Sequence, residues 1–235
     1  MSEFAELGFD MLRRQMLDDL AAQGREFARR LGRDHFSAPV MAAMAQVARH
    51  QHVPYAVRNL AYGATPLPLG FGKTASEPLI VALLSDLLDV QEHHRVLEIG
   101  SGFGYHTAVL AKLCAQVFSV EIVPTLAAQA DARLAAADVK NVTFGIGDGR
   151  YGWSVEAPFD RILVTAAPEI IPQTLLAQLA PGGKMVVPAG LPGAQVLLVV
   201  EKDHAGHLRS REVLPVKFAA LLRADDSTDL LEQAE

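Results

Sequence analysis

The sequence predicts a doubly wound α/β domain with a mostly parallel sheet, a helical cap before it and an antiparallel hairpin at its end. The first observation is an alternation that begins near residue 95, where short β-rich runs take turns with helical patterns. Such alternation is typical of βαβ units, whose strands lie parallel. The second observation is a glycine-rich turn directly after the first of these strands. The third is an ordinary globular composition, with 50% hydrophobic and 20% charged residues.

Length and charge narrow the classes of protein to consider. A chain of 235 residues is long enough for one domain with a full core, so we expect a single domain over residues 1–235. The formal net charge of -6 argues against nucleic acid as a main partner, because phosphate binding needs a basic surface. Charged side chains interrupt the N-terminal stretch, and no later stretch is long and apolar enough to span a membrane. We therefore expect a cytoplasmic protein without membrane contact.

Cysteine and histidine give no sign of a metal centre. The one cysteine, Cys114, excludes an internal disulfide and any zinc cluster based on cysteines. The histidines lack the helical spacing that metal ligands need. We expect Cys114 to pack in the core and the protein to bind no metal.

The segment before the sheet predicts helices and one long loop. Residues 1–60 are expected to form the helical cap, with a second helix over 38–48. The first helix shows apolar residues at three- and four-residue spacing, namely Phe9, Leu12, Met16 and Leu20. Residues 61–78 are rich in glycine and proline, and we interpret them as a substrate and cofactor loop, because loops of this length are usually functional. A helix follows over 77–88, with Ser76 as a natural N-cap.

Residues 79–235 are expected to form the core of the domain. In chain order, the pattern predicts strand 95–99, helix 105–115, strand 116–121, helix 125–137, strand 141–146, strand 159–165, helix 172–180 and strand 184–188. Two further strands, 195–202 and 208–215, flank a polar turn and predict an antiparallel hairpin at one edge of the sheet.

The glycine turn predicts a cofactor site. Gly100, Gly102 and Gly104 leave no Cβ atoms, so a ligand can lie on the backbone while the N–H groups of the next helix point toward it. Dinucleotide-binding turns place their third glycine one residue later, where this chain has Tyr105. Glu98 is also foreign to that pattern. A carboxylate aimed into the crevice suits an ammonium or a sulfonium, and S-adenosylmethionine carries both.

Three other strand ends supply groups that a nucleoside cofactor needs. Glu121 ends the second strand, where a carboxylate can accept hydrogen bonds from ribose hydroxyls of either S-adenosylmethionine or NAD. Asp148 lies between glycines after the third strand and can accept from an adenine amino group, although an Asp-Gly turn without function would look the same. Small residues after Thr165 leave room for a ligand. Since open α/β sheets bind ligands at the carboxyl ends of their strands, the combination favours S-adenosylmethionine.

Several segments together resemble one known family. They are residues 67–70, 74–78, 96–105, 147–149, 159–167, 181–183 and 213–221. Over roughly residues 50 to 220, the chain resembles the protein-L-isoaspartate (D-aspartate) O-methyltransferases. The loop before the glycine turn is the specific part, because the other segments occur across many class I methyltransferases. The resemblance implies a seven-stranded doubly wound sheet, and usually a monomer.

The resemblance also implies an activity. Such enzymes use S-adenosylmethionine to methylate the side carboxylate of isoaspartyl or D-aspartyl residues in damaged proteins, which initiates repair and leaves S-adenosylhomocysteine. The family's active-site serine corresponds to Ser76, and its cofactor also touches the loop 70–74. The expected cofactor-binding residues are therefore Gly70, Phe71, Gly72, Lys73, Thr74, Glu98, Gly100, Ser101, Gly102, Gly104, Tyr105, Glu121, Asp148, Gly149 and Thr165.

The chemistry makes modest demands on the protein. The acceptor carboxylate is ionised at neutral pH, because such groups titrate near ~3.9, so methyl transfer needs no general base. It needs in-line positioning and exclusion of water. Ser76 is expected to orient the carboxylate by a hydrogen bond, and helix capping is its alternative role.

Departures from the family pattern lie on the substrate side. Gly63 and Ala64 stand where the family commonly has an acid, and Lys73 stands where it usually has glutamine. Lys73 either attracts the charge of the substrate or points into solvent. A class I O-methyltransferase for another peptide or small-molecule carboxylate is therefore the alternative function. A cofactor-binding protein that acts through a partner without catalysis is the third. The natural acceptor, the oligomeric state and any gating by the N-terminal helices stay open.

Overall fold

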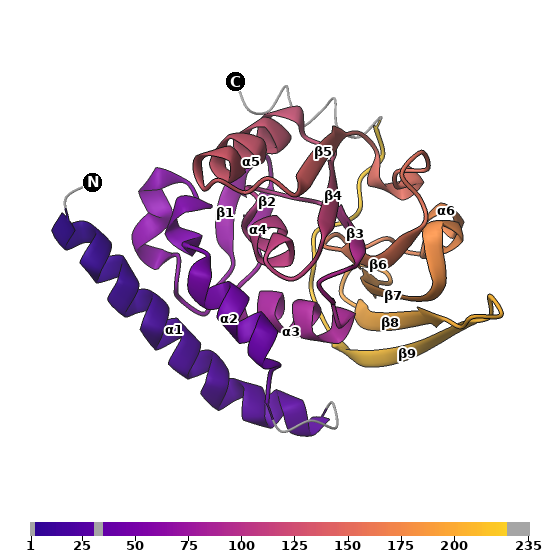
Figure 1. Cartoon of the computed structure of the whole chain (residues 1–235), viewed down its shortest axis with the longest axis horizontal. Coiled ribbons are helices and arrows are strands. Elements are labelled where there is room, and N and C mark those ends of the chain that lie inside the picture. Colours follow the sequence, from indigo (N-terminus) through magenta and orange to yellow (C-terminus); the bar gives the residue numbers. More distant parts are fainter. Residues whose placement is uncertain (1–2, 31–34, 225–235) are drawn as a thin grey trace.

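One seven-stranded sheet with helices on both faces forms the body of the protein, and a long helix lies along one side (Figure 1). The computed structural model describes residues 3–30 and 35–224. The strand order is β5-β4-β3-β6-β7-β8-β9. This architecture confirms the predicted doubly wound fold with its seven strands.

The sheet is parallel in its first part and antiparallel in its last. Strands β3 to β7 pair parallel, whereas β8 and β9 run antiparallel to their neighbours and form the predicted hairpin. The bounds are β3 (Arg95–Ile99), β4 (Gln116–Glu121), β5 (Val142–Ile146), β6 (Phe159–Val164), β7 (Leu179–Ala189), β8 (Val196–Lys202) and β9 (Leu208–Pro215). After β5 the chain returns to the other side of β3, so the strand order reverses between β3 and β6. Open α/β sheets bind ligands at such a reversal.

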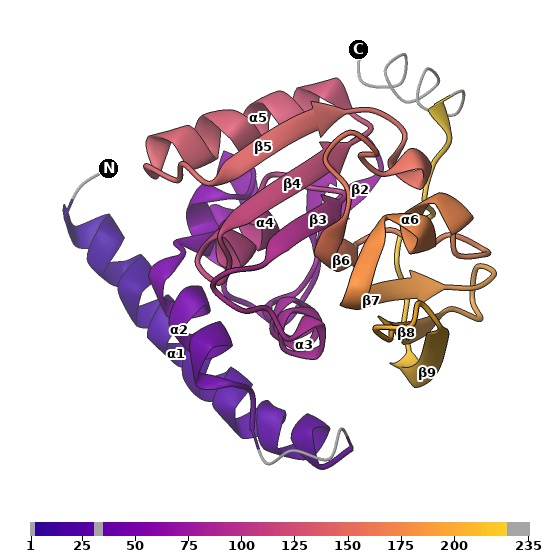
Figure 2. The same ribbon diagram turned by 45° about the vertical axis from the view of Figure 1, so that its right-hand side comes forward.

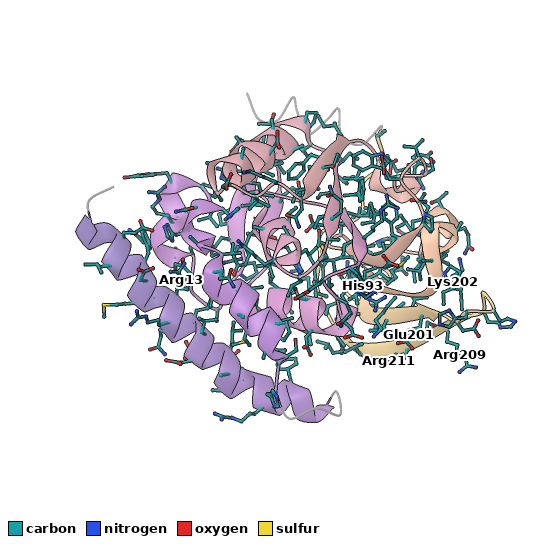
Figure 3. The ribbon with its side chains drawn as sticks, in the orientation of Figure 1. Arg13, His93, Glu201, Lys202, Arg209 and Arg211 are labelled. Carbon is teal, nitrogen blue, oxygen red and sulfur yellow. The ribbon has the colours of Figure 1, made fainter. Side chains whose placement is uncertain are left out.

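Alternate residues of the strands enter two different cores, as the period of two requires. Val96 and Val117 pack with α3 (Pro78–Leu88), α4 (Tyr105–Ala111) and the N-terminal helices, whereas Leu97 and Phe118 face α6 (Gln173–Gln178). Helix α5 (Pro124–Ala136) lies beside β4 and β5, and Figure 2 shows it running along β5. The edge strand β9 exposes Arg209 and Arg211 on the side of the molecule opposite to α1 (Figure 3).

The N-terminal cap is confirmed as helical in its described part. It contains α1 (Glu3–Arg30), α2 (Ala38–Gln46) and two short 3-10 helices, η1 (Arg49–Gln51) and η2 (Tyr55–Leu60). Phe9, Met16 and Leu20 bury one face of α1 against the rest of the protein. Within the described residues, no helix combines the length and the hydropathy that crossing a membrane would require.

The predicted loop 61–78 contains a short hairpin, which is the main correction to the expected elements. Strand β1 (Leu67–Gly70) pairs antiparallel with β2 (Lys73–Ala75). Phe71 at its tip has φ 53°, a conformation that few residues other than glycine adopt. Leu67 and Leu69 point into the protein at the period of a strand, but the glycines and prolines around them hide that alternation in the sequence.

Several predicted bounds also shift. Strands β3 and β4 have the predicted limits, but α4 ends at Ala111 rather than 115, and β7 begins at Leu179 rather than 184. The alternative role of Ser76 as a helix cap is wrong. Helix α3 begins at Pro78, its N-cap is Glu77, and no side chain caps it. Because proline takes the first helical position, the capping position falls one residue after Ser76.

The third glycine of the turn serves packing as well as backbone conformation. Gly104 has φ +81°, and a Cβ there would lie 2.7 Å from Leu134 and 3.2 Å from Ala130 on α5. Gly206 in the β8–β9 turn has a similar φ of +89°, with nothing within 4 Å of an added Cβ. Both glycines therefore have a left-handed backbone, but only at Gly104 does another helix lie close enough to clash with a side chain.

This difference predicts unequal effects of the same substitution. Gly206→Ala should lower the free energy of unfolding by about 1 kcal/mol, the cost of a left-handed alanine. Gly104→Ala should lower it by about 3 kcal/mol, because overpacking against α5 adds to that cost. Urea unfolding of both variants measures the difference. Equal decreases in the free energy of unfolding would show that a side chain at residue 104 does not clash with α5.

Candidate functional site

A cleft opens at the carboxyl ends of β3, β4 and β6, where the strand order reverses. Three parts of the chain form its walls: the glycine turn with the end of β4, the β1–β2 hairpin, and the segment after β9. It is lined by Arg49, His52, Leu69, Lys73, Thr74, Ala75, Ser76, Val81, Ile99, Gly100, Ser101, Gly102, Phe103, Tyr105, His106, Val120, Glu121, Ile122, Leu126, Gly149, Thr165, Ala166, Ala219, Ala220, Leu221 and Leu222.

Most of the predicted site residues meet in this cleft. The expected residues that line it are Lys73, Thr74, Ser76, Gly100, Ser101, Gly102, Tyr105, Glu121, Gly149 and Thr165. The expected residues that are not among its lining residues are Gly70, Phe71, Gly72, Glu98, Gly104 and Asp148. The first three form the tip of the hairpin, whereas Glu98 lies in β3, Gly104 directly precedes α4, and Asp148 follows the end of β5.

Glu121 is the best-oriented polar side chain of the cleft. Its Oε2 accepts a hydrogen bond from the amide of Gly102 (3.0 Å), and its Oε1 accepts from the amides of Ile122 (3.0 Å) and Val123 (3.1 Å). The residue is 5% exposed. Oε1 therefore uses both of its lone pairs, whereas Oε2 keeps one with which Glu121 can still accept a hydrogen bond from a ligand hydroxyl. A vicinal diol such as ribose fits this donor requirement.

The glycine turn is held by the neighbouring strand. The single hydroxyl proton of Thr165 is shared between the carbonyls of Ile99 (2.9 Å) and Gly100 (2.7 Å). A Cβ on Gly100, which has φ +94°, would lie 2.5 Å from the Thr165 Oγ1. The missing side chain of Gly100 therefore permits this close contact within the protein.

Asp148 is engaged within the protein. Its carboxylate accepts hydrogen bonds from the Arg150 guanidinium, from the Arg150 amide (2.9 Å) and from the amide of Ala224 (3.2 Å). Burial alone would raise the pKa of Asp148, but the hydrogen bonds and the charge of Arg150 lower it below its ordinary value. In this structure Asp148 caps the 3-10 helix η3 (Gly149–Tyr151), which agrees with the alternative of a structural turn. Its neighbour Gly149 lines the cleft instead.

Glu98 lies behind the cleft, sealed between β3, β4 and α4. Thr107 and Ser119 both donate hydroxyls to its Oε2 at 2.6 Å, while Oε1 has no partner among the described residues. The side chain is fully buried, and burial raises the pKa of Glu98 to about 7, against the lowering effect of the two hydroxyls. The sequence predicted that the Glu98 carboxylate would point into the crevice, but Glu98 is not among the residues that line the cleft.

Lys73 and Ser76 lie on the hairpin side of the cleft. Lys73 is half-buried, and desolvation lowers its pKa while the charge of Glu121 opposes the shift. Lys73 lines the cleft, and attraction of the substrate's charge stays a prediction. Ser76 is also half-buried and lines the cleft, with its carbonyl oxygen bonded to Arg49.

Arg49 and His52 are lining residues that the sequence analysis missed. Both lie in or next to η1, a polar run between helices that carries no recognisable motif. His52 contacts the Phe103 carbonyl through Nδ1 (3.1 Å), and burial lowers the pKa of His52 to about 4. Burial similarly lowers the pKa of the cleft residue His106 to about 3, and its Nε2 pairs with Ser85 (2.9 Å). Both imidazoles are therefore neutral at physiological pH.

The segment after β9 closes one side of the cleft. Ala167 donates its amide to the carbonyl of Ala219 and accepts from the amide of Leu221, both at 2.8 Å. Gln195 fixes the same segment by bonding both backbone groups of Phe218. Residues far apart in sequence thus form one wall. In the parts of the chain that the structure describes, no group of three His, Cys, Asp or Glu side chains is placed to hold a metal ion.

Comparison with known proteins gives a consistent result. A family model described as Protein-L-isoaspartate(D-aspartate) O-methyltransferase (PCMT) matches residues 27–226. The chain is 47% identical over 220 residues to "Protein-L-isoaspartate O-methyltransferase 1" of a Polaromonas species, covering 94% of this chain and 93% of the relative. It is 45% identical over 210 residues to "Protein-L-isoaspartate O-methyltransferase 2" of Syntrophobacter fumaroxidans, covering 89% and 85%.

Solved structures agree on the fold. A structure titled as a protein-L-isoaspartate O-methyltransferase superposes with a TM-score of 0.76 at 25% identity, covering 90% of this chain and 66% of the other. A putative protein-L-isoaspartate O-methyltransferase from Plasmodium falciparum, in complex with S-adenosyl-L-homocysteine, superposes with a TM-score of 0.75 at 23% identity, covering 90% and 98%.

The buried position of Glu98 predicts a pH-dependent stability. Its folded pKa of about 7 exceeds the ordinary value of 4.5, so the folded state holds this proton more tightly than the unfolded state does. The free energy of unfolding should therefore fall as the pH rises from 4.5 to above about 7, by about 3 kcal/mol at most. Glu98→Gln should remove this decline, and Glu92→Gln, at an exposed position, should retain it. Urea unfolding at several pH values checks this, and identical slopes for both variants would contradict it.

Proposed function

Because the chain belongs to the protein-L-isoaspartate (D-aspartate) O-methyltransferase family, we propose that it methylates the side carboxylate of L-isoaspartyl or D-aspartyl residues with S-adenosylmethionine. The observation that carries this proposal is the cleft itself. One wall presents a carboxylate and a glycine turn suited to a nucleoside, and the hairpin side presents Ser76 and Lys73. A donor and an anionic acceptor can thus meet between them.

The residues present fit the cofactor. Glu121 would hold the ribose, since its carboxylate is already oriented by three amides and lies on the cleft. Ser101 and Gly102 would contact the amino-acid portion, and Ile122 and Leu126 offer apolar surface to the base. The cofactor supplies an electrophilic methyl group on a sulfonium. The protein must hold that group in line with the acceptor oxygen and keep water away.

The acceptor needs orientation rather than proton removal. A carboxylate with a pKa near ~3.9 is already ionised, so no general base is required. The lowered pKa values of His52 and His106 leave both imidazoles neutral, and we assign neither a catalytic proton transfer. Ser76 is the residue that we propose to orient the acceptor, through a hydrogen bond to one carboxylate oxygen.

A different acceptor is the second candidate function. It is favoured by Lys73, which lines the cleft and would attract any anionic peptide or small molecule. Gly63 and Ala64, the other departures from the family pattern, are exposed and do not line the cleft. We further propose that the protein acts as a monomer with a single domain, as the resemblance to the family implies. A cytoplasmic location stays our expectation from the sequence.

The direct test uses a pair of peptides that differ only in one linkage. We expect base-labile methyl incorporation from labelled S-adenosylmethionine into the isoaspartyl peptide and little into the matching aspartyl peptide. Equal labelling of both would contradict the proposed acceptor. Binding of S-adenosylhomocysteine without any labelling would favour a non-catalytic binding protein.

Ser76→Ala separates catalysis from stability. Loss of one hydrogen bond to a charged acceptor should lower kcat/KM about 10-fold or more. The melting midpoint should move by less than about 2 °C, because no capping bond is lost. Ser210→Ala on the exposed strand β9 is the control and should leave both values unchanged. A large fall in melting midpoint with unchanged kcat/KM would assign Ser76 a structural role.

A further inference from the structure

We propose that Arg49 is the carboxylate-binding residue at the floor of the cleft, donating one hydrogen bond through Nη1 to the acceptor carboxylate. This inference rests on the proposed function and adds to it the residue that distinguishes a carboxylate from a neutral amide. Its basis is a buried guanidinium that lines the cleft with one nitrogen unpartnered.

The guanidinium of Arg49 is fixed on two sides and on one face. Its Nε donates to the carbonyl of Ala61 and its Nη2 to the carbonyl of Ser76, both at 2.6 Å. Its central carbon lies 4.6 Å from the centre of the Tyr105 ring, which provides a cation–π contact. The side chain is 0% exposed. An arginine held in this way is already oriented before a ligand arrives.

The third nitrogen has no partner. Arg49 Nη1 is buried, and no acceptor among the described residues bonds to it. No carboxylate of the described residues forms an ion pair with Arg49. The charge of Glu77 acts on the guanidinium without such a contact and slightly opposes the lowering of its pKa. Burial lowers the pKa of Arg49, the expected effect of a desolvated charge, although arginine still stays protonated. A buried charge is costly unless it is paired, so an anion that enters the cleft would complete this site.

The geometry suits an acceptor that must also react. Nε and Nη2 are occupied by carbonyls, so Arg49 can offer a carboxylate one hydrogen bond rather than the usual bidentate pair. One oxygen is then bound, and the other keeps its lone pairs free to attack the methyl group. The bond to the Ser76 carbonyl places the guanidinium beside the residue that we propose to orient the same carboxylate.

This arrangement also gives a basis for specificity. A neutral amide in place of the carboxylate would leave the guanidinium without a counter-ion, and hydrogen bonds to charged groups are stronger than those between neutral ones. Sites that bury a group needing a partner reject analogues that lack it. We therefore expect selection of the free carboxylate over the corresponding amide.

A carboxylate can reach Arg49 from two sources, the acceptor or the amino-acid portion of the cofactor. Arg49→Gln, which removes the charge, and Arg49→Lys, which keeps it, distinguish them when three quantities are measured. These are KM for an isoaspartyl peptide, and the dissociation constants of S-adenosylhomocysteine and of methylthioadenosine, which lacks the amino-acid carboxylate. Arg95→Gln is the matched control, because Arg95 also stacks on an aromatic ring but lies at the opposite end of β3.

We expect Arg49→Gln to raise KM about 10- to 100-fold, with a smaller rise for Arg49→Lys and unchanged affinity for both nucleosides. Arg95→Gln should leave KM unchanged. Weaker binding of S-adenosylhomocysteine, with methylthioadenosine unaffected, would overturn the proposal in favour of the cofactor carboxylate. A lower melting midpoint with unchanged KM would overturn it in favour of a structural role.

A measurement on the wild-type protein covers the case in which the variants do not fold. With S-adenosylhomocysteine bound, the ¹⁵N guanidinium resonances of Arg49 are followed by NMR during addition of the isoaspartyl peptide or its amide counterpart. We expect the Nη1 signal to shift with the carboxylate peptide and not with the amide. Equal shifts, or none while the peptide binds, would refute the proposal. If the peptide is not methylated at all, the result counts against the proposed function rather than against the role of Arg49.

Discussion

The bond network of Glu121 is the interaction on which the site depends. It joins the end of β4 to the glycine turn after β3, because one carboxylate accepts the amides of Gly102, Ile122 and Val123. The turn is fixed from the other side by Thr165 at the end of β6. Three adjacent strand ends are therefore locked together where the strand order reverses, and a rigid cradle results before any ligand enters.

Charges are distributed unevenly around that cradle. Glu121 gives the nucleoside wall a negative group, whereas Arg49 at the floor and Lys73 on the hairpin side give the cleft two cations. Glu98 is withdrawn from the cleft into the sheet, where burial favours its protonated form. A methyl donor with hydroxyls and a positive centre would meet the negative group, and an acceptor with a negative charge would meet the cations. Methyl transfer to a carboxylate requires such an arrangement.

The sequence predicted the sheet, the hairpin and the glycine turn well, because period-two patterns and turn residues are local signals. It failed for β1 and β2, whose glycines and prolines conceal a short alternation, and for the capping role of Ser76, which Pro78 displaces. Arg49 could not be found in this way. Its importance comes from burial and from carbonyls at Ala61 and Ser76, and such contacts exist only in the folded chain.

The central claim is that Glu121 and the glycine turn form a ribose-binding cradle for S-adenosylmethionine. Calorimetric titration with S-adenosylhomocysteine and with its 2′,3′-dideoxy analogue tests it most directly. Loss of the ribose hydrogen bond to Oε2 of Glu121 should weaken the analogue's binding about 10-fold or more. Equal affinity of the two compounds, or no binding of S-adenosylhomocysteine, would contradict the account.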